Sequence, residues 1–207
     1  VGNGTIEFSA DSITTTVSYS VVTAGEGAVT EVKIALTPIN DAFVAEGKKY
    51  KNKNFGDLYY LNVGEHAKMM EMQTYIQFNL SQIPSGATIN EAKLRLYVFY
   101  STISDYKTHA LYRIIEPWDE LEITWNNRPY VSTDIVSYEI IPPSMSGFWV
   151  EWDVTDDVQA AVNGTPHYGW MIKIKDISPV LKEYISFYSK EYSDESLRPK
   201  LIVKYTS

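Results

Sequence analysis

The side chains that most often carry out catalysis are scattered along this sequence without a recognisable catalytic pattern. His66, His109 and His167 fall in unrelated contexts, and there is no His-Glu-x-x-His motif, no Gly-x-Ser-x-Gly motif and no glycine-rich phosphate loop. Cysteine is absent, which excludes thiol nucleophiles, cysteine-ligated zinc and iron–sulfur clusters. We therefore predict no catalytic residue, no metal site and no cofactor.

Acidic side chains are plentiful enough to supply the paired carboxylates that glycosidases use. The candidates are Glu116, Asp119, Glu120, Glu122, Glu151 and Asp153. Acidic residues in solvated loops are far more common than catalytic pairs, so we expect a protein that is not an enzyme. A turnover assay on uronic-acid polysaccharides would test this expectation.

One basic cluster stands out, and its composition suits the binding of carboxylated sugars. It consists of Lys48, Lys49, Tyr50, Lys51, Asn52 and Lys53. Ammonium groups form ion pairs with carboxylates, the amide forms hydrogen bonds, and the tyrosine ring offers contact area. The alternative interpretation is a mobile surface loop that its lysines keep soluble, and composition alone favours this alternative.

Length and charge restrict the partners. The chain has 207 residues and a formal net charge of −8, which opposes binding to nucleic acid. No run approaches the roughly 20 apolar residues that span a bilayer. The sequence begins at Val1 without methionine, as a secreted product does after its signal peptide is removed, although a trimmed chain begins in the same way. We expect an extracellular or cell-surface location.

The strands that must position these residues are indicated by period-2 alternation. Leu94, Leu96 and Val98 alternate with Lys93, Arg95 and Tyr97, and similar stretches occur around residues 13–21, 32–36, 170–175 and 200–205. Glycine and proline turns separate them. This pattern predicts an all-β fold, an antiparallel β-sandwich of the jelly-roll kind.

A single short helix is expected over residues 155–162. Thr155 is the predicted N-cap, Asp156 and Asp157 lie in the first turn where the helix dipole favours acids, and Asn163-Gly164 provides the stop. The two carboxylates could instead ligate calcium, but capping accounts for them.

The first 36 residues form an extension with a flexible segment at Ala24-Gly25-Glu26-Gly27. Its first strand is amphipathic, with one face made by Ile13, Val17, Tyr19 and Val21. An isolated strand is marginal in water, so this one must join a sheet. Either the extension folds onto its own domain as a hairpin, or the strand completes the sheet of the next subunit, which generates a head-to-tail filament. We weight the two about equally, with a lean to donation.

Three triplets have the form of N-glycosylation acceptors, and they begin at Asn3, Asn79 and Asn163. In an exported glycoprotein each could carry a glycan, although such triplets also arise by chance. Pro166 follows the third triplet and can hinder its use. An intact mass above 23.6 kDa would reveal attached glycan.

Residues 37–207 resemble the DNRLRE domain family. The segments that carry the resemblance are Asp41-Ala42-Phe43-Val44, Asn54-Phe55-Gly56, Tyr75 to Leu80, Ala87 to Val98, Trp118 to Pro129, Trp152 to Gln159, Ser186 to Glu191 and Arg198 to Tyr205. The family usually has aspartate where this chain has Asn79. The resemblance implies an extracellular, non-catalytic β-sandwich, of which some members bind acidic polysaccharides.

Two functions follow from these observations. The first is a cell-surface structural subunit, or adhesion protein, that polymerises through its N-terminal strand with other copies of itself. The alternative is a carbohydrate-binding module for an acidic polysaccharide. The segment from Trp118 to Pro129 bears on the alternative, because its two indoles either fill a packed corner or form a platform for a sugar ring. We predict the packed corner.

Overall fold

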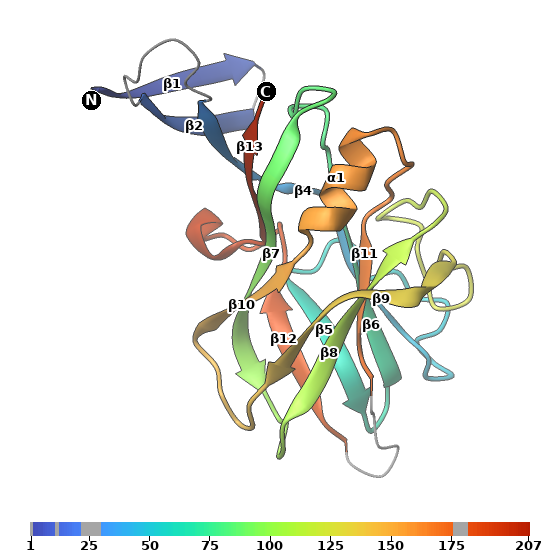
Figure 1. The fold of residues 1–207 in the computed structure, drawn as a ribbon. Helices are drawn as coiled ribbons and strands as arrows, with labels where there is room; N and C mark the ends of the chain where they lie inside the picture. The colour runs from blue at the N-terminus through green and yellow to red at the C-terminus, as the bar shows by residue number, and fades with distance from the viewer. Residues whose placement is uncertain (1, 11–12, 22–29, 176–181) are drawn as a thin grey trace.

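The computed structural model describes residues 2–10, 13–21, 30–175 and 182–207, and the side chains among them from residue 30 onward. Figure 1 shows the strands and helices that these residues form. In chain order they are β1 (Gly2–Ala10), β2 (Ile13–Val21), β3 (Glu31–Leu36), β4 (Pro38–Ala45), β5 (Tyr60–His66), β6 (Met70–Phe78), β7 (Thr88–Ser101), β8 (Lys107–Ile114), β9 (Val131–Ile141), β10 (Phe148–Asp153), α1 (Thr155–Val162), β11 (Trp170–Ile174), β12 (Tyr184–Tyr188), the 3-10 helix η1 (Glu195–Leu197) and β13 (Lys200–Thr206).

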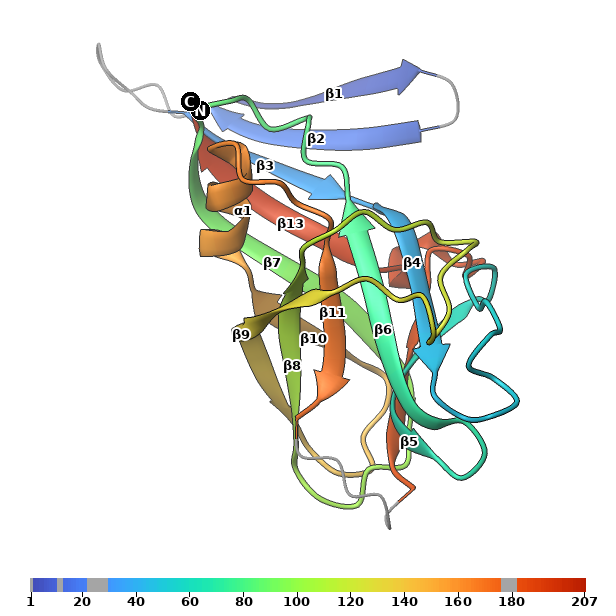
Figure 2. The same ribbon diagram turned by 90° about the vertical axis from the view of Figure 1, so that its right-hand side faces the viewer.

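The strands are joined into one curled antiparallel sheet. Its order is β1-β2-β3-β13-β7-β12-β5-β6-β11-β8-β9, while β10 pairs with β7 and β4 pairs with β6. Figure 2 shows how the sheet curls, with β7 and β13 on one side and β6, β8 and β11 on the other. The predicted all-β antiparallel sandwich is confirmed. Among the described residues, no helix is long and apolar enough to cross a membrane.

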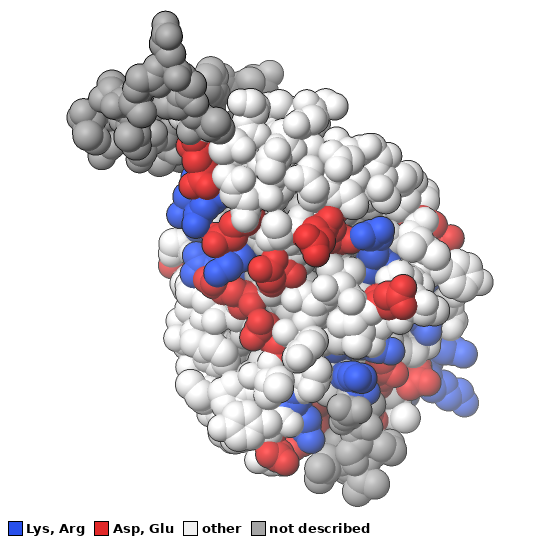
Figure 3. All heavy atoms as spheres, in the orientation of Figure 1, with Lys and Arg blue, Asp and Glu red and all other residues white. Residues whose placement is uncertain are grey.

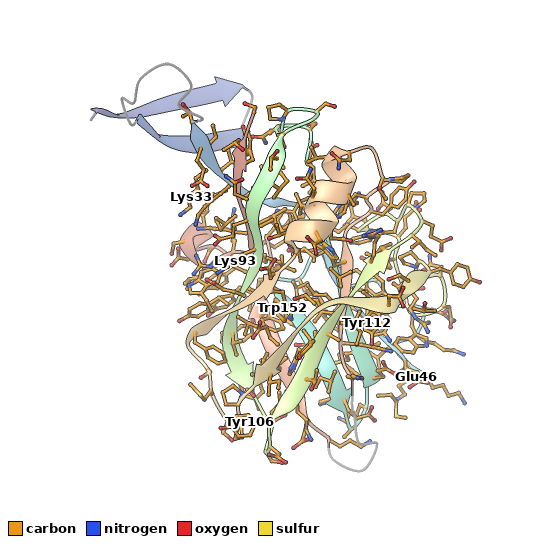
Figure 4. The ribbon with its side chains drawn as sticks, in the orientation of Figure 1. Lys33, Glu46, Lys93, Tyr106, Tyr112 and Trp152 are labelled. Atoms are coloured by element: carbon orange, nitrogen blue, oxygen red, sulfur yellow. The ribbon has the colours of Figure 1, made fainter. Side chains whose placement is uncertain are left out.

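The core lies between the two halves of the curled sheet, and the alternation in the sequence selects its members. Leu94, Leu96 and Val98 of β7 are fully buried, whereas the intervening side chains point outward. They form one cluster with inward residues of the opposite half, such as Trp170 and Ile172 of β11. Trp152, labelled near the centre of Figure 4, is also fully buried.

The N-terminal strands continue this sheet rather than standing apart from it. β1 pairs with β2 along its whole length, and β2 pairs with β3 at Ser18 and Tyr19. β3 in turn pairs with β13, and its Ile34 and Leu36 are buried in the main core. The backbone pairing that a donated strand would find in another copy is therefore made by β2 within its own chain.

The predicted helix is present over residues 155–162, but the residue that caps it differs from the prediction. The N-cap position is Val154, which makes no side-chain cap bond. Asp153 Oδ1 accepts from the Thr155 amide at 3.0 Å, while Thr155 Oγ1 accepts from the Ala92 amide at 2.9 Å. Thr155 thus joins the helix to β7 instead of closing it. The stop occurs as predicted, with Gly164 at a φ of 102°.

Asp157 has a structural task beyond the first turn of the helix. Its carboxylate is buried, accepts from Arg113 Nε at 2.6 Å and from the Trp170 indole at 2.7 Å. These bonds satisfy the charge that burial would otherwise penalise. A favourable position in the first turn is therefore not the whole role of Asp157, because its carboxylate also binds the helix to β8 and β11.

Candidate functional site

The lysine-rich segment forms a fixed loop after β4, which we call the lysine loop (residues 46–55). The Gly47 amide donates to the Met69 carbonyl at 2.8 Å, and the Lys51 and Lys53 amides close two turns by donating to Gly47 and Tyr50 at 2.9 and 2.8 Å. A side chain at Gly47 would lie 2.4 Å from the Lys68 carbonyl oxygen, so only glycine fits there. These bonds define the path of the loop backbone, and whether its lysines bind a sugar stays a prediction.

The four lysines of this loop all face solvent. Lys53 Nζ lies 5.4 Å from the centre of the Tyr50 ring. In the part of the chain whose side chains are described, Lys48, Lys49, Lys51 and Lys53 form no ion pair with a carboxylate. Figure 3 shows blue Lys and Arg spheres gathered at the lower right of the molecule, the side on which Figure 4 labels Glu46. The loop therefore presents positive charge on a protein that is acidic as a whole.

A small apolar cluster supports the loop from below. Phe55 stacks on Phe43 of β4 with ring centres 4.4 Å apart, and Phe43 in turn stacks on Tyr60 at 5.8 Å. The cluster is completed by buried Ala45 and Met72 and by the partly buried Tyr50, Leu58, Met69 and Tyr184. The lysine loop thus rests on a packed aromatic cluster.

The face of β5 and β12 that points away from the main core carries a groove of about 380 Å³. Its lining residues come from β5 and the residue before it, from β6 and the turn before it, and from β7 and β12: Tyr59, Tyr60, Asn62, His66, Met69, Met72, Phe99, Tyr100, Tyr184 and Ser186. Tyr59 and Tyr100 keep 53% and 45% of their surface exposed. Tyr60, Met69, Met72 and Tyr184 belong both to this lining and to the cluster under the lysine loop. The loop and the groove are therefore parts of one surface.

Stacked rings extend this surface across β7 and β12. Phe99 stacks on Tyr188 at 4.5 Å, Tyr188 on Tyr192 at 3.5 Å, and Tyr59 lies 6.4 Å from Tyr192. The hydrogen bond to Tyr192, followed by burial, raises the pKa of Tyr188 to about 12, so its hydroxyl stays neutral. Apolar ring faces with hydroxyl tips suit a ligand that is apolar on one side and polar at its edges.

A larger hollow of about 990 Å³ lies between β9 and α1, and its charge differs from that of the lysine loop. Glu139, Asp153 and Asp156 line it beside a single lysine, Lys175. Carboxylates there would repel an acidic ligand, although the hollow is the bigger one. For an anionic chain, the tyrosine-lined groove is the better candidate.

The segment from Trp118 to Pro129 forms a packed corner. The Trp118 indole donates to the Tyr168 carbonyl at 2.9 Å and lies edge-on to Tyr75, with ring centres 6.0 Å apart. The Arg128 guanidinium lies 3.9 Å from the Trp125 ring centre. Both indoles pack over a buried cluster on β4, β6 and β11. The arrangement agrees with the predicted corner rather than with a sugar platform.

Most of the carboxylates considered for catalysis hold backbone or salt-bridge partners. Glu116 accepts from the Tyr130 amide, Asp119 from the Leu121 amide, and Glu151 pairs with Arg95 at 2.6 Å. Glu120 has partners as well, the Asp41 amide at 2.7 Å and Lys190 Nζ at 2.8 Å, but it differs from the others because it is buried beside Asp41 and Glu191. Burial raises the pKa of Glu120, and burial together with the charge of Glu191 raises that of Asp41.

The predicted glycosylation and assembly residues lie away from the groove. Asn79 and Asn163 are exposed, while the side chain of Asn3 lies outside the described residues. Ile13, Val17, Tyr19 and Val21 lie on β2, and their side chains are likewise outside the described part. Glycosylation and pairing with another copy both stay predictions.

Sequence reasoning missed the tyrosines of the groove. Tyr60, Tyr100 and Tyr184 are far apart in the chain and meet because β12 pairs with both β5 and β7. The available signal was the outward position of Tyr97 and Phe99 in an alternating strand. That signal identifies an outer face, but it does not show which strands lie beside it.

An antiparallel β-sandwich whose open groove offers ring faces and hydroxyl tips has the chemistry of a sugar-binding module. The comparison with families supports this class: residues 32–205 match carbohydrate-binding module family 96, and the chain belongs to that family. Such modules are non-catalytic, which agrees with the absence of a catalytic motif. The match covers the segments that resemble DNRLRE domains, and that name remains a resemblance. The comparison with curated proteins found no match.

Proposed function

We propose that this protein binds an acidic, uronate-containing polysaccharide along the tyrosine-lined groove and the lysine loop. The observation that carries the proposal is the set of side chains shared by the groove and the base of the loop, Tyr60, Met69, Met72 and Tyr184. Because these residues join the two, ring faces and free ammonium groups lie on one continuous surface.

The chemistry of the two parts is complementary. Sugar rings present apolar C–H faces that pack on tyrosine, and their hydroxyls can exchange hydrogen bonds with Asn62 and the tyrosine hydroxyls. Carboxylates of a uronate chain pair with Lys48, Lys49, Lys51 and Lys53, which lack carboxylate partners among the described side chains. The lysines are exposed, so each pair contributes modestly, and binding weakens as salt rises.

The test is affinity electrophoresis and calorimetry of the protein with a polyuronate and with a neutral glucan. Replacing the four lysines with serine should abolish retention by the polyuronate. A second comparison uses two double variants. Lys48→Ser/Lys49→Ser removes two charges from the loop, and its matched control, Lys33→Ser/Lys175→Ser, removes two charges at distant exposed positions. Retention that survives the fourfold replacement, equal binding of the neutral glucan, or equal loss in the control pair would each contradict the proposal.

Extracellular or cell-surface placement belongs to this proposal, because polysaccharides of this kind are found outside the cell. A non-catalytic role belongs to it as well. Turnover of the polyuronate by the purified protein would contradict it.

Head-to-tail assembly into a filament is the second candidate. β2 uses both of its edges within its own chain, so pairing with another copy would fall to β1, the outermost strand of the sheet order. Electron microscopy of the full chain and of a chain lacking residues 1–24 tests it. Filaments that persist in the truncated chain, or no filaments in the full chain, would contradict assembly through this region.

A further inference from the structure

Three acidic side chains from distant parts of the sequence meet beside β4. Asp41 lies on β4, Glu120 in the Trp118 to Pro129 segment and Glu191 just after β12. One carboxylate oxygen of each lies within 4.8 Å of one from each of the others. Backbone bonds fix the meeting point, because the Asp41 amide donates to Glu120 Oε1 at 2.7 Å and the Lys190 amide donates to Asp41 Oδ2 at 2.9 Å.

Two oxygens of this acidic cluster have no hydrogen-bond partner although they are buried. Lys190 Nζ pairs with Glu120 Oε2 at 2.8 Å and with Glu191 Oε1 at 2.5 Å. Asp41 Oδ1 and Glu191 Oε2 are left without a partner. Asp41 is 1% exposed, so its carboxylate is shielded from bulk solvent. A buried carboxylate oxygen without a donor costs free energy, and such groups are rare in folded proteins.

The charge and the spacing of the cluster fit a dication. Three carboxylates and one ammonium leave a local charge of −2. Calcium binds carboxylate oxygens at about 2.3–2.6 Å, so ligands on opposite sides of the ion are roughly 4.6–5.2 Å apart. Magnesium holds its ligands at about 2.0–2.1 Å in a rigid octahedron, which requires a smaller cage.

The geometry points to a calcium site formed by Asp41, Glu120 and Glu191, with Asp41 Oδ1 and Glu191 Oε2 as its main ligands. This site departs from the expectation of no metal, and it does not rest on the proposed function. The ion would join β4 to the two segments that Figure 2 shows meeting beside it. Asn54 Nδ2 donates to the Glu120 carbonyl at 2.7 Å, so the ion would also steady the end of the lysine loop.

The experiment is thermal unfolding of the full chain after treatment with EDTA, with and without calcium. If about 1 mM calcium is about 100 times the dissociation constant of the site, calcium should raise the unfolding temperature by roughly 5–10 °C. Asp41→Asn and, separately, Glu191→Gln should remove most of this shift. Glu122→Gln is the matched control, because Glu122 is an exposed carboxylate of the same segment, and it should keep the full shift.

Several results would overturn the inference. No shift with calcium, together with unfolding temperatures that rise as the pH falls, would mean that Asp41 and Glu191 share a proton instead. An equal shift with magnesium would reject calcium as the ion. A shift retained in both cluster variants would place the ion elsewhere. If Asp41→Asn does not fold, Glu191→Gln decides alone, because Glu191 is partly exposed and its replacement is better tolerated.

Discussion

The two outer sides of this sandwich are both rich in aromatic rings, yet one is closed and the other open. On the closed side, Trp118 and Trp125 lie over β4, β6 and β11, and the Trp118 indole has a backbone acceptor. On the open side, Tyr59 and Tyr100 keep about half of their surface exposed beside the groove. The difference lies in whether a loop folds back over the rings. Aromatic composition alone therefore does not identify a binding surface.

Removing the Trp118 ring tests the closed side and should have the largest effect. Trp118→Ala deletes the contact with Tyr75 and the bond to Tyr168, so we expect a loss of about 3 kcal/mol in the free energy of unfolding. Urea denaturation measures it. Tyr130→Ala, which removes a ring that is 75% exposed, should stay within about 0.5 kcal/mol. Unchanged stability with lost polysaccharide binding would make the corner the sugar platform instead.

Lowering the pH should reduce the free energy of unfolding, because His109 is fully buried between the two sides. Burial lowers the pKa of His109 to about 4, while an unfolded chain keeps the ordinary value of 6.5. The unfolded state therefore takes up the proton first, so this stability is present above pH 6.5 and is lost as the pH falls to 4. The shift corresponds to at most about 3 kcal/mol.

Denaturant titrations of wild type and His109→Gln at several pH values measure this contribution. Asp41 and Glu120 act in the opposite direction, since their raised pKa values mean that protonation relieves a buried charge. The contribution of His109 is therefore the difference in the free energy of unfolding between wild type and His109→Gln at each pH. Parallel pH profiles of wild type and variant would show that His109 does not contribute.

A single groove tyrosine should have the smallest effect, and on binding rather than on stability. Tyr100→Ala removes an exposed ring, so we expect roughly a tenfold loss of affinity for the polyuronate, or about 1.4 kcal/mol. Tyr106→Ala is the control, because Tyr106 is 65% exposed and lies outside the groove, at the lower end of the view in Figure 4. Equal losses in both variants would remove the distinction between the groove and other exposed rings.

Much of the fold could be predicted because alternation reports burial directly. Leu94, Leu96 and Val98, like Trp170 and Ile172, are buried as their spacing indicates. The helix was also placed correctly, but its capping was not, because the role of Thr155 depends on a bond to Ala92 on another strand. Local patterns define elements, whereas partners between elements follow from the topology.

The site was less predictable for the same reason. The lysine loop is contiguous in sequence and is visible there as a basic cluster, while the groove joins residues about 120 positions apart. The acidic cluster joins Asp41 to Glu191, and of its three members only Glu120 was considered for a chemical role from the sequence, as a possible catalytic acid. Strand pairing brings these residues together, and no spacing along one strand encodes it.

The pairing of β3 with β13 has a mechanical consequence. Glu31 lies opposite Thr206, so the start of one strand and the end of the other are adjacent. Tension between these two points would break the hydrogen bonds between β3 and β13 one pair after another, because antiparallel bonds run across the strands. Stretched in this way, the edge should peel open at low force long before the sandwich itself yields.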